Sequence, residues 1–320
     1  FLITFQTVQA TTVSPIRIEL NSDPGGTLNS SFKVTNDEVK ENTYSIVIAR
    51  FETKDETGDP VFVSGREQIP SWIEVSNSVT VPGRGSRQVP FTITVPNNVD
   101  PGGYFAGVFV SKLAPGTDGN AEIGLQSNVG TLIFLRVNGD FKEGEIILEF
   151  ATRDKQKFFS SLPVSFYYRF QNSGEDRVKP LGDIIIKNLF GFTTKVVNAN
   201  PSAGSVLPKS IRKFFITWQT SGGSEVEVNS ADVIEQPKAQ TYVETLKWQW
   251  QHFAFGRYSA HMTLTIDNDA SRSYSKKTSF WVIPWQLVGT IIVSSALILG
   301  LLLGLAIIIV LLILRRREKK

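Results

Sequence analysis

Residues 278–292, TSFWVIPWQLVGTII, change character in the middle. The first half, SFWVI, is rich in aromatic and β-branched residues, which is typical of a β-strand. The second half opens an apolar run that continues for another two dozen residues. Pro284 stands at the change and suits the first position of a helix, where its missing N–H does no harm. The stretch therefore predicts a strand that passes into a membrane helix without a flexible stalk.

The apolar run predicts a single membrane span over residues 284–314. Residues 287–314 contain no charged side chain, and a spanning helix needs about 20 such residues. A buried helix of a soluble protein would show a polar face. Trp281 and Trp285 are expected at the level of the lipid headgroups.

The ends of the chain give its orientation. Arg315, Arg316 and Arg317 open the basic tail 315–320, and positive residues beside a span stay in the cytoplasm. Residues 1–10 end in Val-Gln-Ala behind an apolar stretch, as at a signal-peptidase site, and are interpreted as the remnant of a signal peptide; an ordinary first strand is the alternative. We expect a single-pass plasma-membrane protein with its N-terminus outside and its C-terminus inside.

Charge and cysteine content narrow the class of protein. Residues 1–314 carry 28 basic and 29 acidic side chains, so the exterior part has no electrostatic footprint for nucleic acid. The chain has no cysteine, whereas extracellular domains of animals usually carry disulfides. This composition favours a bacterial surface protein.

The exterior part reads as β-structure throughout. Short runs rich in Val, Ile, Phe and Thr, such as SFKVTN at 31–36 and YFAGVFVS at 104–111, alternate with turn clusters such as NNVDPGG at 97–103. No segment there keeps a helical period. Many short strands with frequent turns predict an all-β fold of sandwich type.

Three internal echoes predict two related sandwiches in tandem. SFKVTN from Ser31 resembles SFYYRFQN from Ser165, and TVPGRGSRQVPFTITV from Thr80 resembles SVLPKSIRKFFITW from Ser205. PGGYFAGVFV, from Pro101, resembles AFGRYSAHMTLTI in the same order. An Asn-Gly turn signal near 138–139 divides them into domains 11–140 and 141–283.

The second domain carries a polar insertion at 219–244, which is expected to form an exposed loop or an extended hairpin. The following LKWQWQHF, residues 246–253, is interpreted as a strand with Trp248, Trp250 and His252 on one face. Both tryptophans either pack into the second core or form an exposed aromatic contact strip.

The sequence offers little for catalysis, metals or cofactors. His252 and His261 are expected on strands and have no metal-ligand spacing. No nucleophile motif, phosphate loop or dinucleotide fingerprint is present. We therefore expect a chain that is not an enzyme and has no cofactor.

The span carries a packing motif of its own. Ala296, Gly300 and Gly304 recur every four residues, and small residues at that spacing let two helix backbones approach. We expect this face to pack against another copy of the chain or against a partner helix.

Three stretches carry a resemblance to a known family: SPIRIELNSDPGGTLNSSFKVTN at 14–36, the segment from VTVPGRG to GYFAGVFV, and the later FWVIPWQL. With them, the chain resembles the WxL-interacting protein family of bacterial cell surfaces. The resemblance implies two immunoglobulin-like sandwiches, one C-terminal span and a basic tail. It also implies binding of peptidoglycan by the first domain and of partner proteins, such as WxL-domain proteins, by the second.

Three functions are compatible with this architecture. The first is surface adhesion or scaffolding, with loops 116–122 and 219–244 as the expected contacts. The second is a membrane-tethered assembly chaperone that works by strand addition. The third is the ectodomain of a membrane complex that docks through the small-residue face of its helix.

Overall fold

The computed structural model describes residues 11–53, 55–63, 65, 67–112, 129–219 and 241–318. The expected signal-peptide remnant 1–10, loop 116–122 and residues 220–240 of the insertion lie outside these ranges. The first sandwich contains β1 (Thr11–Ser14), β2 (Arg17–Ser22), β3 (Thr27–Asn36), β4 (Asn42–Thr53), β5 (Pro60–Val63), α1 (Ile69–Trp72), β6 (Ile73–Val75), β7 (Ser78–Val81), β8 (Ser86–Thr94), β9 (Gly102–Lys112) and β10 (Val129–Val137).

These strands form two sheets because their side chains alternate between a buried and an exposed face. One sheet has the order β1-β3-β8-β6, and the other has the order β2-β10-β9-β4-β5 with β7 added beside β4. Phe32 and Val34 of β3 lie opposite Val89 and Arg87 of β8, and both are fully buried. Each such side chain contributes about 2 kcal/mol of hydrophobic stabilisation.

The second sandwich is built from β11 (Glu145–Thr152), η1 (Arg153–Lys155), β12 (Phe158–Phe159), β13 (Val164–Asn172), β14 (Pro180–Asn188), β15 (Thr193–Asn198), β16 (Ser210–Trp218), β17 (Gly256–Ile266) and β18 (Asp269–Val282). Its sheets have the orders β11-β13-β16 and β12-β18-β17-β14-β15. Phe166, Trp218 and Phe280 meet in its core, with ring centroids 5.4 and 6.1 Å apart.

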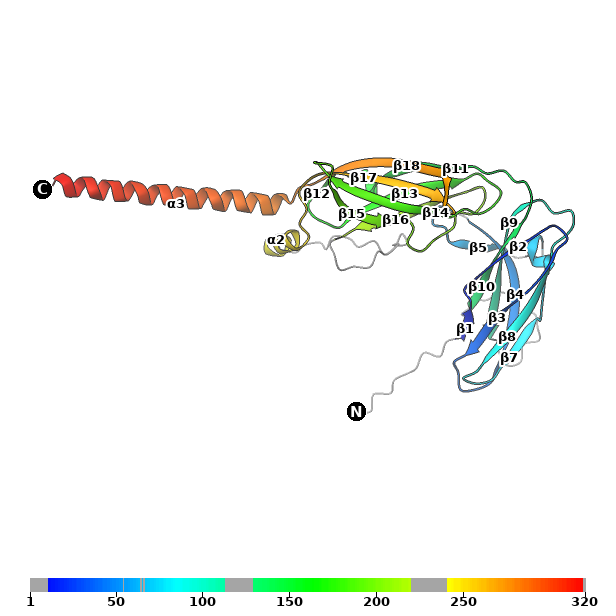
Figure 1. Ribbon diagram of the computed structural model, residues 1–320. Coiled ribbons are helices and arrows are strands. Elements are labelled where there is room, and N and C mark those ends of the chain that lie inside the picture. The colour runs from blue at the N-terminus through cyan, green and yellow to red at the C-terminus, as the bar shows by residue number, and fades with distance from the viewer. Residues whose placement is uncertain are drawn as a thin grey trace, which may run out of the picture. The chain divides into compact units, whose positions relative to one another are not determined.

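The two sandwiches share the order in which their central strands are connected, as expected of two similar domains in tandem (Figure 1). In each, the first strand joins one sheet and the next crosses to the other, where it runs parallel to the last strand: β2 beside β10 and β12 beside β18. β9 lies between β10 and β4 as β17 lies between β18 and β14. The expected all-β class of two immunoglobulin-like sandwiches is therefore confirmed.

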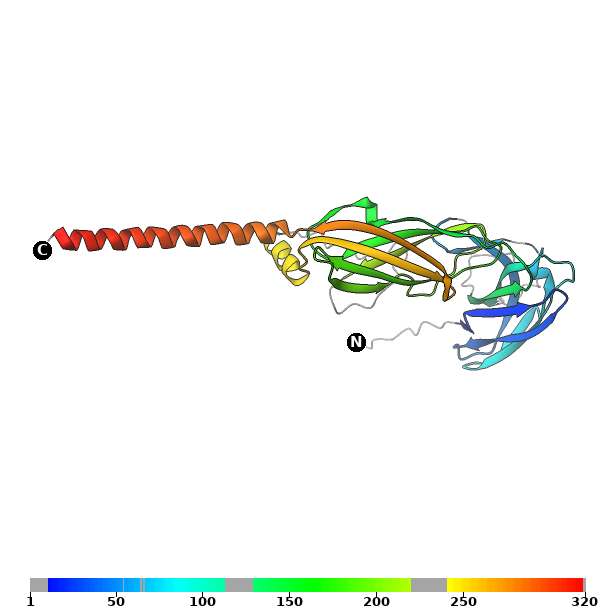
Figure 2. The same ribbon diagram turned by 45° about the horizontal axis from the view of Figure 1, so that its top comes forward.

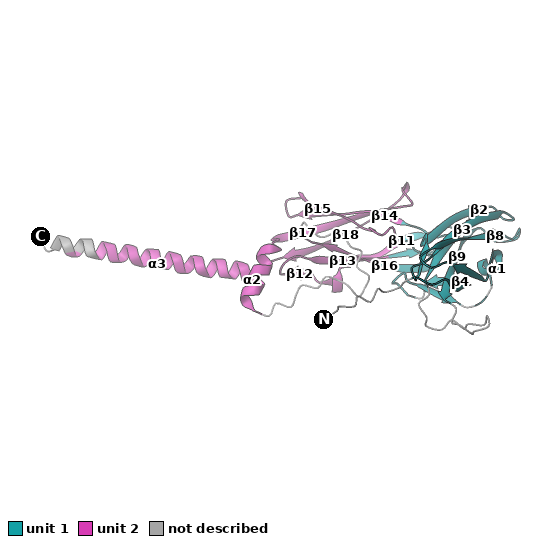
Figure 3. Ribbon diagram, turned by 90° about the horizontal axis from the view of Figure 1, so that it is seen from below, with its two compact units in different colours: residues 1–146, 170–179, 205–213 teal, residues 147–169, 180–204, 214–320 magenta. Residues whose placement is uncertain are grey.

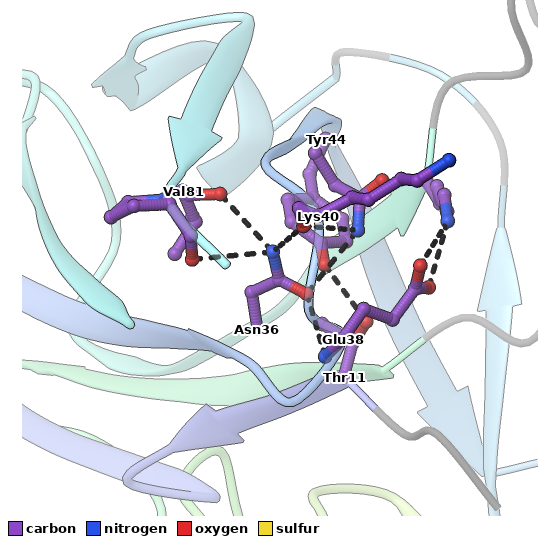
Figure 4. Close-up of polar contacts among 9 residues, drawn as sticks. Thr11, Asn36, Glu38, Lys40, Tyr44 and Val81 are labelled. Atoms are coloured by element: carbon purple, nitrogen blue, oxygen red, sulfur yellow. Dashed lines mark hydrogen bonds and ion pairs between the residues drawn. The ribbon is translucent and has the colours of Figure 1, made fainter. Parts of the chain in front are cut away.

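The first echo marks a buried asparagine with the same role in both sandwiches. Asn36 and Asn172 end their strands and are fully buried. The Nδ2 atom of Asn36 donates to the carbonyls of Lys40 and Val81, at 2.8 and 3.1 Å (Figure 4). Asn172 donates in the same way to Asp176 and Val206, at 2.7 and 3.0 Å. Each buried amide thus ties the turn after its strand to a segment distant in the sequence, and its own polar atoms are hydrogen-bonded as buried groups require.

The third echo marks the start of a central strand. Gly102 and Gly256 open β9 and β17 with φ values of +138° and +115°, which glycine adopts without strain. Two residues later, the hydroxyl groups of Tyr104 and Tyr258 donate to backbone carbonyls, at 2.8 and 3.3 Å. Glycine and tyrosine therefore fix the same corner in both copies.

The structure divides into two compact units (Figure 3). The first comprises residues 1–146, 170–179 and 205–213, and the second comprises 147–169, 180–204 and 214–320. The second unit also holds α2 (Tyr242–Gln251) and α3 (Trp285–Glu318). α3 follows β18 along the chain (Figure 2), and it is long and apolar enough to cross a membrane.

Candidate functional site

The junction between β18 and α3 is short, as the sequence predicts. β18 ends at Val282 and α3 begins at Trp285, so two residues separate them. The carbonyl of Pro284 accepts the N–H of Val288 at 2.9 Å, the first bond of the helical pattern. Pro284 therefore caps α3 from the position before its first turn, one residue earlier than predicted, and its missing N–H is harmless there too. α3 also runs beyond 314 into the basic tail.

The prediction of a strand over LKWQWQHF is wrong, because these residues belong to α2 and its C-terminal cap. A capping box starts the helix: Thr241 accepts the N–H of Glu244, and the Glu244 carboxylate accepts the N–H of Thr241. Thr-x-x-Glu is a sequence signal for a helix start, and it lies inside the segment interpreted as an exposed insertion. His252 is the C-cap of α2, whereas His261 lies on β17 as expected.

α2 holds the first turn of α3 through a buried glutamine that the sequence interpretation missed. Gln249 is 1% exposed. Its Oε1 accepts the N–H of Leu287 at 3.0 Å, and its Nε2 donates to the side chain of Gln286. The first N–H groups of a helix have no partner within the helix, so Gln249 caps α3 from a neighbouring element.

Further bonds fix α2 on both sides. The hydroxyl group of Tyr242 lies 2.7 Å from Oγ1 of Thr290, which places the start of α2 beside the second turn of α3. Nε1 of Trp248 donates to Oγ of Ser161 at 3.2 Å, and its ring stacks on His252 at 3.7 Å. Trp248 is thus half-buried against the sandwich, whereas Trp250 points away and is 69% exposed. Helical geometry separates the two rings that a strand would have put on one face.

The hairpin between β14 and β15 ends in an apolar tip, residues 189–192. Oδ1 of Asn188 accepts the N–H groups of Phe190 and Phe192, both at 3.0 Å. Gly191 provides the positive φ, +84°, that the turn requires. The backbone of the tip is therefore satisfied locally, while the side chains of Leu189, Phe190 and Phe192 are 62, 80 and 71% exposed.

This tip lies at the end of the second sandwich from which α3 leaves. Asn188 pairs with Tyr258, and Gly256 pairs with Val282. The same end carries other exposed apolar side chains, which together with the tip form what we call the apolar collar: Phe158, Leu189, Phe190, Phe192, Phe253, Phe255 and Trp281. Of the large apolar side chains exposed on the sandwich part of the second unit, as far as it is described, Val196 alone lies elsewhere.

A basic depression of about 400 Å³ adjoins the collar. Its walls include Arg257 and Lys277, together with the hydroxyl-bearing Ser259 and Ser279. No carboxylate among the described residues forms an ion pair with Arg257 or Lys277. Partial burial, and then the charges of Lys277 and Lys187, lower the pKa of the neighbouring His261. This face therefore has a positive potential suited to anions.

The residues predicted for the membrane lie on or beside α3. Trp281 and Trp285, 38 and 64% exposed, flank the junction. Arg315 is exposed, and Arg316 and Arg317 follow it within the helix. Ala296, Gly300 and Gly304 recur along one face of α3, and a Cβ added at either glycine would meet no atom within 4 Å. Packing of this face against another helix remains a prediction.

A second apolar surface lies on the first sandwich. The larger sheet presents five phenylalanines on its outer side, which we call the aromatic face: Phe51, Phe62, Phe105, Phe109 and Phe134. Their ring centroids lie 4.5 to 5.8 Å apart. Leu207, from the same compact unit, packs with Phe51 and Phe134. Phe62 is 37% exposed and Phe109 is partly exposed, where outer sheet faces are usually polar.

Within the described ranges, no group of three or more His, Asp or Glu side chains is arranged to hold a metal ion. Buried polar side chains such as Asn36 and Gln249 form hydrogen bonds that hold the fold together. The features that distinguish this molecule are therefore its helix junction and its exposed apolar surfaces.

No protein-family model and no curated protein matches the chain. Among solved structures, it is similar to the class 5 fimbriae chaperone CfaA at 10% identity and a TM-score of 0.41, covering 84% of this chain and 99% of that one. The Escherichia coli chaperone DraB has 10% identity and a TM-score of 0.37, with coverages of 85 and 97%. The Pseudomonas aeruginosa chaperone CupB2 has 9% identity and a TM-score of 0.33, with coverages of 84 and 100%. These likenesses concern the fold alone, and membership of the WxL-interacting family stays a prediction.

Proposed function

We propose that this chain is a non-enzymatic, membrane-anchored protein of the bacterial surface that holds partner proteins close to the bilayer. The observation that carries the proposal is the locked junction between the second sandwich and α3. Two residues connect β18 to α3, and Gln249 caps the helix from the side. A protein that only needed a tether would do as well with a flexible linker.

The aromatic face supports protein binding by the first sandwich. Phe62 and Phe109 pack edge to face at 4.5 Å and leave apolar surface open to solvent. Rigid aromatic side chains of this kind dominate the energetics of protein interfaces. We therefore assign the first contact with a partner to this end of the sheet. Binding of peptidoglycan, which the family resemblance implies, stays a prediction.

A second candidate, the tethered assembly chaperone, is favoured by the edge of β18. In the first sandwich β2 pairs with six residues of β10, whereas β12 pairs only with Trp281 and Val282 of β18. Within the described ranges no strand pairs with the rest of that edge. A partner could add a strand there. Lys276 and Lys277 would select an acidic partner strand and discourage indiscriminate pairing.

Site-specific photo-crosslinking in native membranes tests the two candidates. A photoreactive amino acid replaces Phe62 in one version of the chain and Ser275, which is exposed on β18, in another. Val39, an exposed residue in the turn after β3, serves as the control position. The proposal predicts adducts with a surface protein at Phe62 and not at Val39. Adducts at Ser275 with a partner that is not exported without this chain would establish the chaperone instead.

The role of the junction is tested in the same membranes. A flexible Gly/Ser segment inserted between Ile283 and Pro284 leaves both sandwiches and the span unchanged, but it lets the second sandwich move relative to α3. We expect the variant to reach the membrane at the normal level and to give a reduced yield of the Phe62 adduct. An undiminished yield would show that the locked junction has no part in partner capture.

A further inference from the structure

The exposed apolar side chains of the second sandwich gather where the chain enters the membrane. The tip of the β14–β15 hairpin, the loop before β17 and the end of β18 lie far apart in the sequence, yet they meet at the α3 end of the sandwich (Figure 1). Their exposed side chains contribute to the apolar collar. The opposite end of the same sheet, at the turn between β17 and β18, shows the polar residues Asp267, Asn268 and Asp269. One end of the sandwich is therefore built differently from the other.

The length of α3 places this end at the level of the headgroups. Residues 287–314 are uncharged and would extend about 42 Å as a helix, whereas the hydrocarbon core of a bilayer is about 30 Å thick. With Arg315 at the cytoplasmic surface, the first turns of α3 lie outside the hydrocarbon. Tyr242 contacts α3 at Thr290, within those turns, so α2 lies in the interfacial layer and the collar lies close to it.

The chemistry of the collar suits that layer. Aromatic rings are enriched where membrane meets water, and the collar and α2 together expose Phe, Trp and Tyr rings. Arg257 and Lys277 in the adjoining depression offer cationic groups where anionic lipid phosphates lie. Exposed apolar surface of this extent would be a liability in water. The hydrogen bonds of Phe190 and Phe192 to Asn188 give the hairpin tip a defined turn, which presents its side chains outward.

We propose that the second sandwich rests on the outer surface of the bilayer, with Leu189, Phe190 and Phe192 inserted among the lipid headgroups and Arg257 and Lys277 facing lipid phosphates. α3 anchors the chain, and the collar fixes the tilt of the second sandwich. The second unit therefore contacts the membrane at two places. The inference shares with the proposed function only the assumption that α3 spans the bilayer.

Depth-dependent fluorescence quenching tests the contact. The chain has no cysteine, so one introduced cysteine is the sole site for a thiol-reactive, polarity-sensitive dye. Full-length Thr193→Cys places the dye beside the tip and leaves its apolar residues intact. Ala270→Cys, exposed at the opposite end of the same sheet, is the matched control. Leu299→Cys reports on the span itself.

In lipid nanodiscs carrying a quencher near the headgroup, we expect a blue-shifted, strongly quenched dye at Thr193→Cys and an unquenched dye at Ala270→Cys. Phe190→Ser with Phe192→Ser, added to Thr193→Cys, should abolish the quenching. Arg257→Gln with Lys277→Gln should remove any increase in quenching that phosphatidylglycerol brings. Loss of quenching without a change in hydrogen exchange at β14 and β15 would show that the variants have kept their fold.

Two results would overturn the inference. If the dyes at Thr193→Cys and Ala270→Cys are equally unquenched while a dye at Leu299→Cys is quenched by acyl-chain quenchers, the collar does not touch the bilayer, although the anchor and the proposed function stand. If the dye at Leu299→Cys is also unquenched, α3 does not span the membrane, and the inference and the proposed function fail together.

Discussion

At the scale of single residues, one buried asparagine in each sandwich links two segments that are distant in the sequence. Asn36 joins the turn after β3 to the loop after β7, because its amide donates to the carbonyls of both Lys40 and Val81. Asn36→Ala leaves the Val81 carbonyl without this donor and the N–H of Glu38 without its acceptor, Oδ1 of Asn36 at 3.1 Å. The Lys40 carbonyl keeps the amide of Asn42 as a donor. Each unsatisfied buried group costs about 1–3 kcal/mol. We expect the free energy of unfolding to fall by about 2–4 kcal/mol, measured by urea unfolding of the full chain in detergent.

Asn42→Ala is the control for that change. Asn42 donates to Oδ1 of Asn36 at 3.2 Å and to the carbonyl of Lys40 at 3.3 Å, but it is only partly buried, so water can replace the lost bonds. Its removal should cost about 1 kcal/mol or less. Equal losses for the two variants would mean that burial of Asn36 does not determine its contribution.

At the scale of elements, the joint between α2 and α3 depends on Gln249. Gln249→Leu keeps the volume of the side chain but leaves the N–H of Leu287 without its acceptor. We expect the amide of Leu287 to exchange with solvent about tenfold faster, as loss of a bond worth about 1.4 kcal/mol implies. Hydrogen exchange with mass spectrometry on the chain in detergent micelles measures this rate.

Gln251→Leu provides the matched comparison, since Gln251 is on the same helix and exposed. Exchange at the start of α3 should not respond to it. If Gln249→Leu also leaves that exchange unchanged, the cap from α2 does not stabilise the first turn of α3.

At the scale of the whole molecule, the small-residue face of α3 predicts a partner within the membrane. Gly300→Ile with Gly304→Ile fills the space through which two backbones would approach. Helix contacts of this kind contribute about 1–2 kcal/mol, so association should weaken about tenfold. Energy transfer between donor- and acceptor-labelled chains in vesicles measures it. Leu301→Ile, on a different face, should have no effect, and unchanged transfer in the glycine variant would exclude self-association through this face.

Local patterns in the sequence predicted the strands, the long apolar helix and the two sandwiches in tandem. Alternating apolar and polar residues indicate a strand because successive side chains of a strand point to opposite faces. A row of 28 uncharged residues indicates a membrane helix because it is long enough to cross a bilayer. The echoes around Asn36 and Asn172 could be recognised in the sequence because each turn requires an asparagine at the same position. The capping box at Thr241, which marks the start of α2, was also present in the sequence. The segment with Trp248 and Trp250 was nevertheless assigned to a strand, because two aromatic residues at a spacing of two suggest strand alternation.

Only the tertiary structure decided which elements lie side by side. Gln249 caps α3 only because α2 packs beside the junction, and no local pattern marks a glutamine that will serve another helix. The apolar tip at 189–192 lies at the α3 end of the sandwich only because β14 pairs with β17 in the register that sets Asn188 opposite Tyr258. Such pairings join residues some seventy positions apart, and they depend on the summed packing of both sheets, which no stretch of sequence contains by itself.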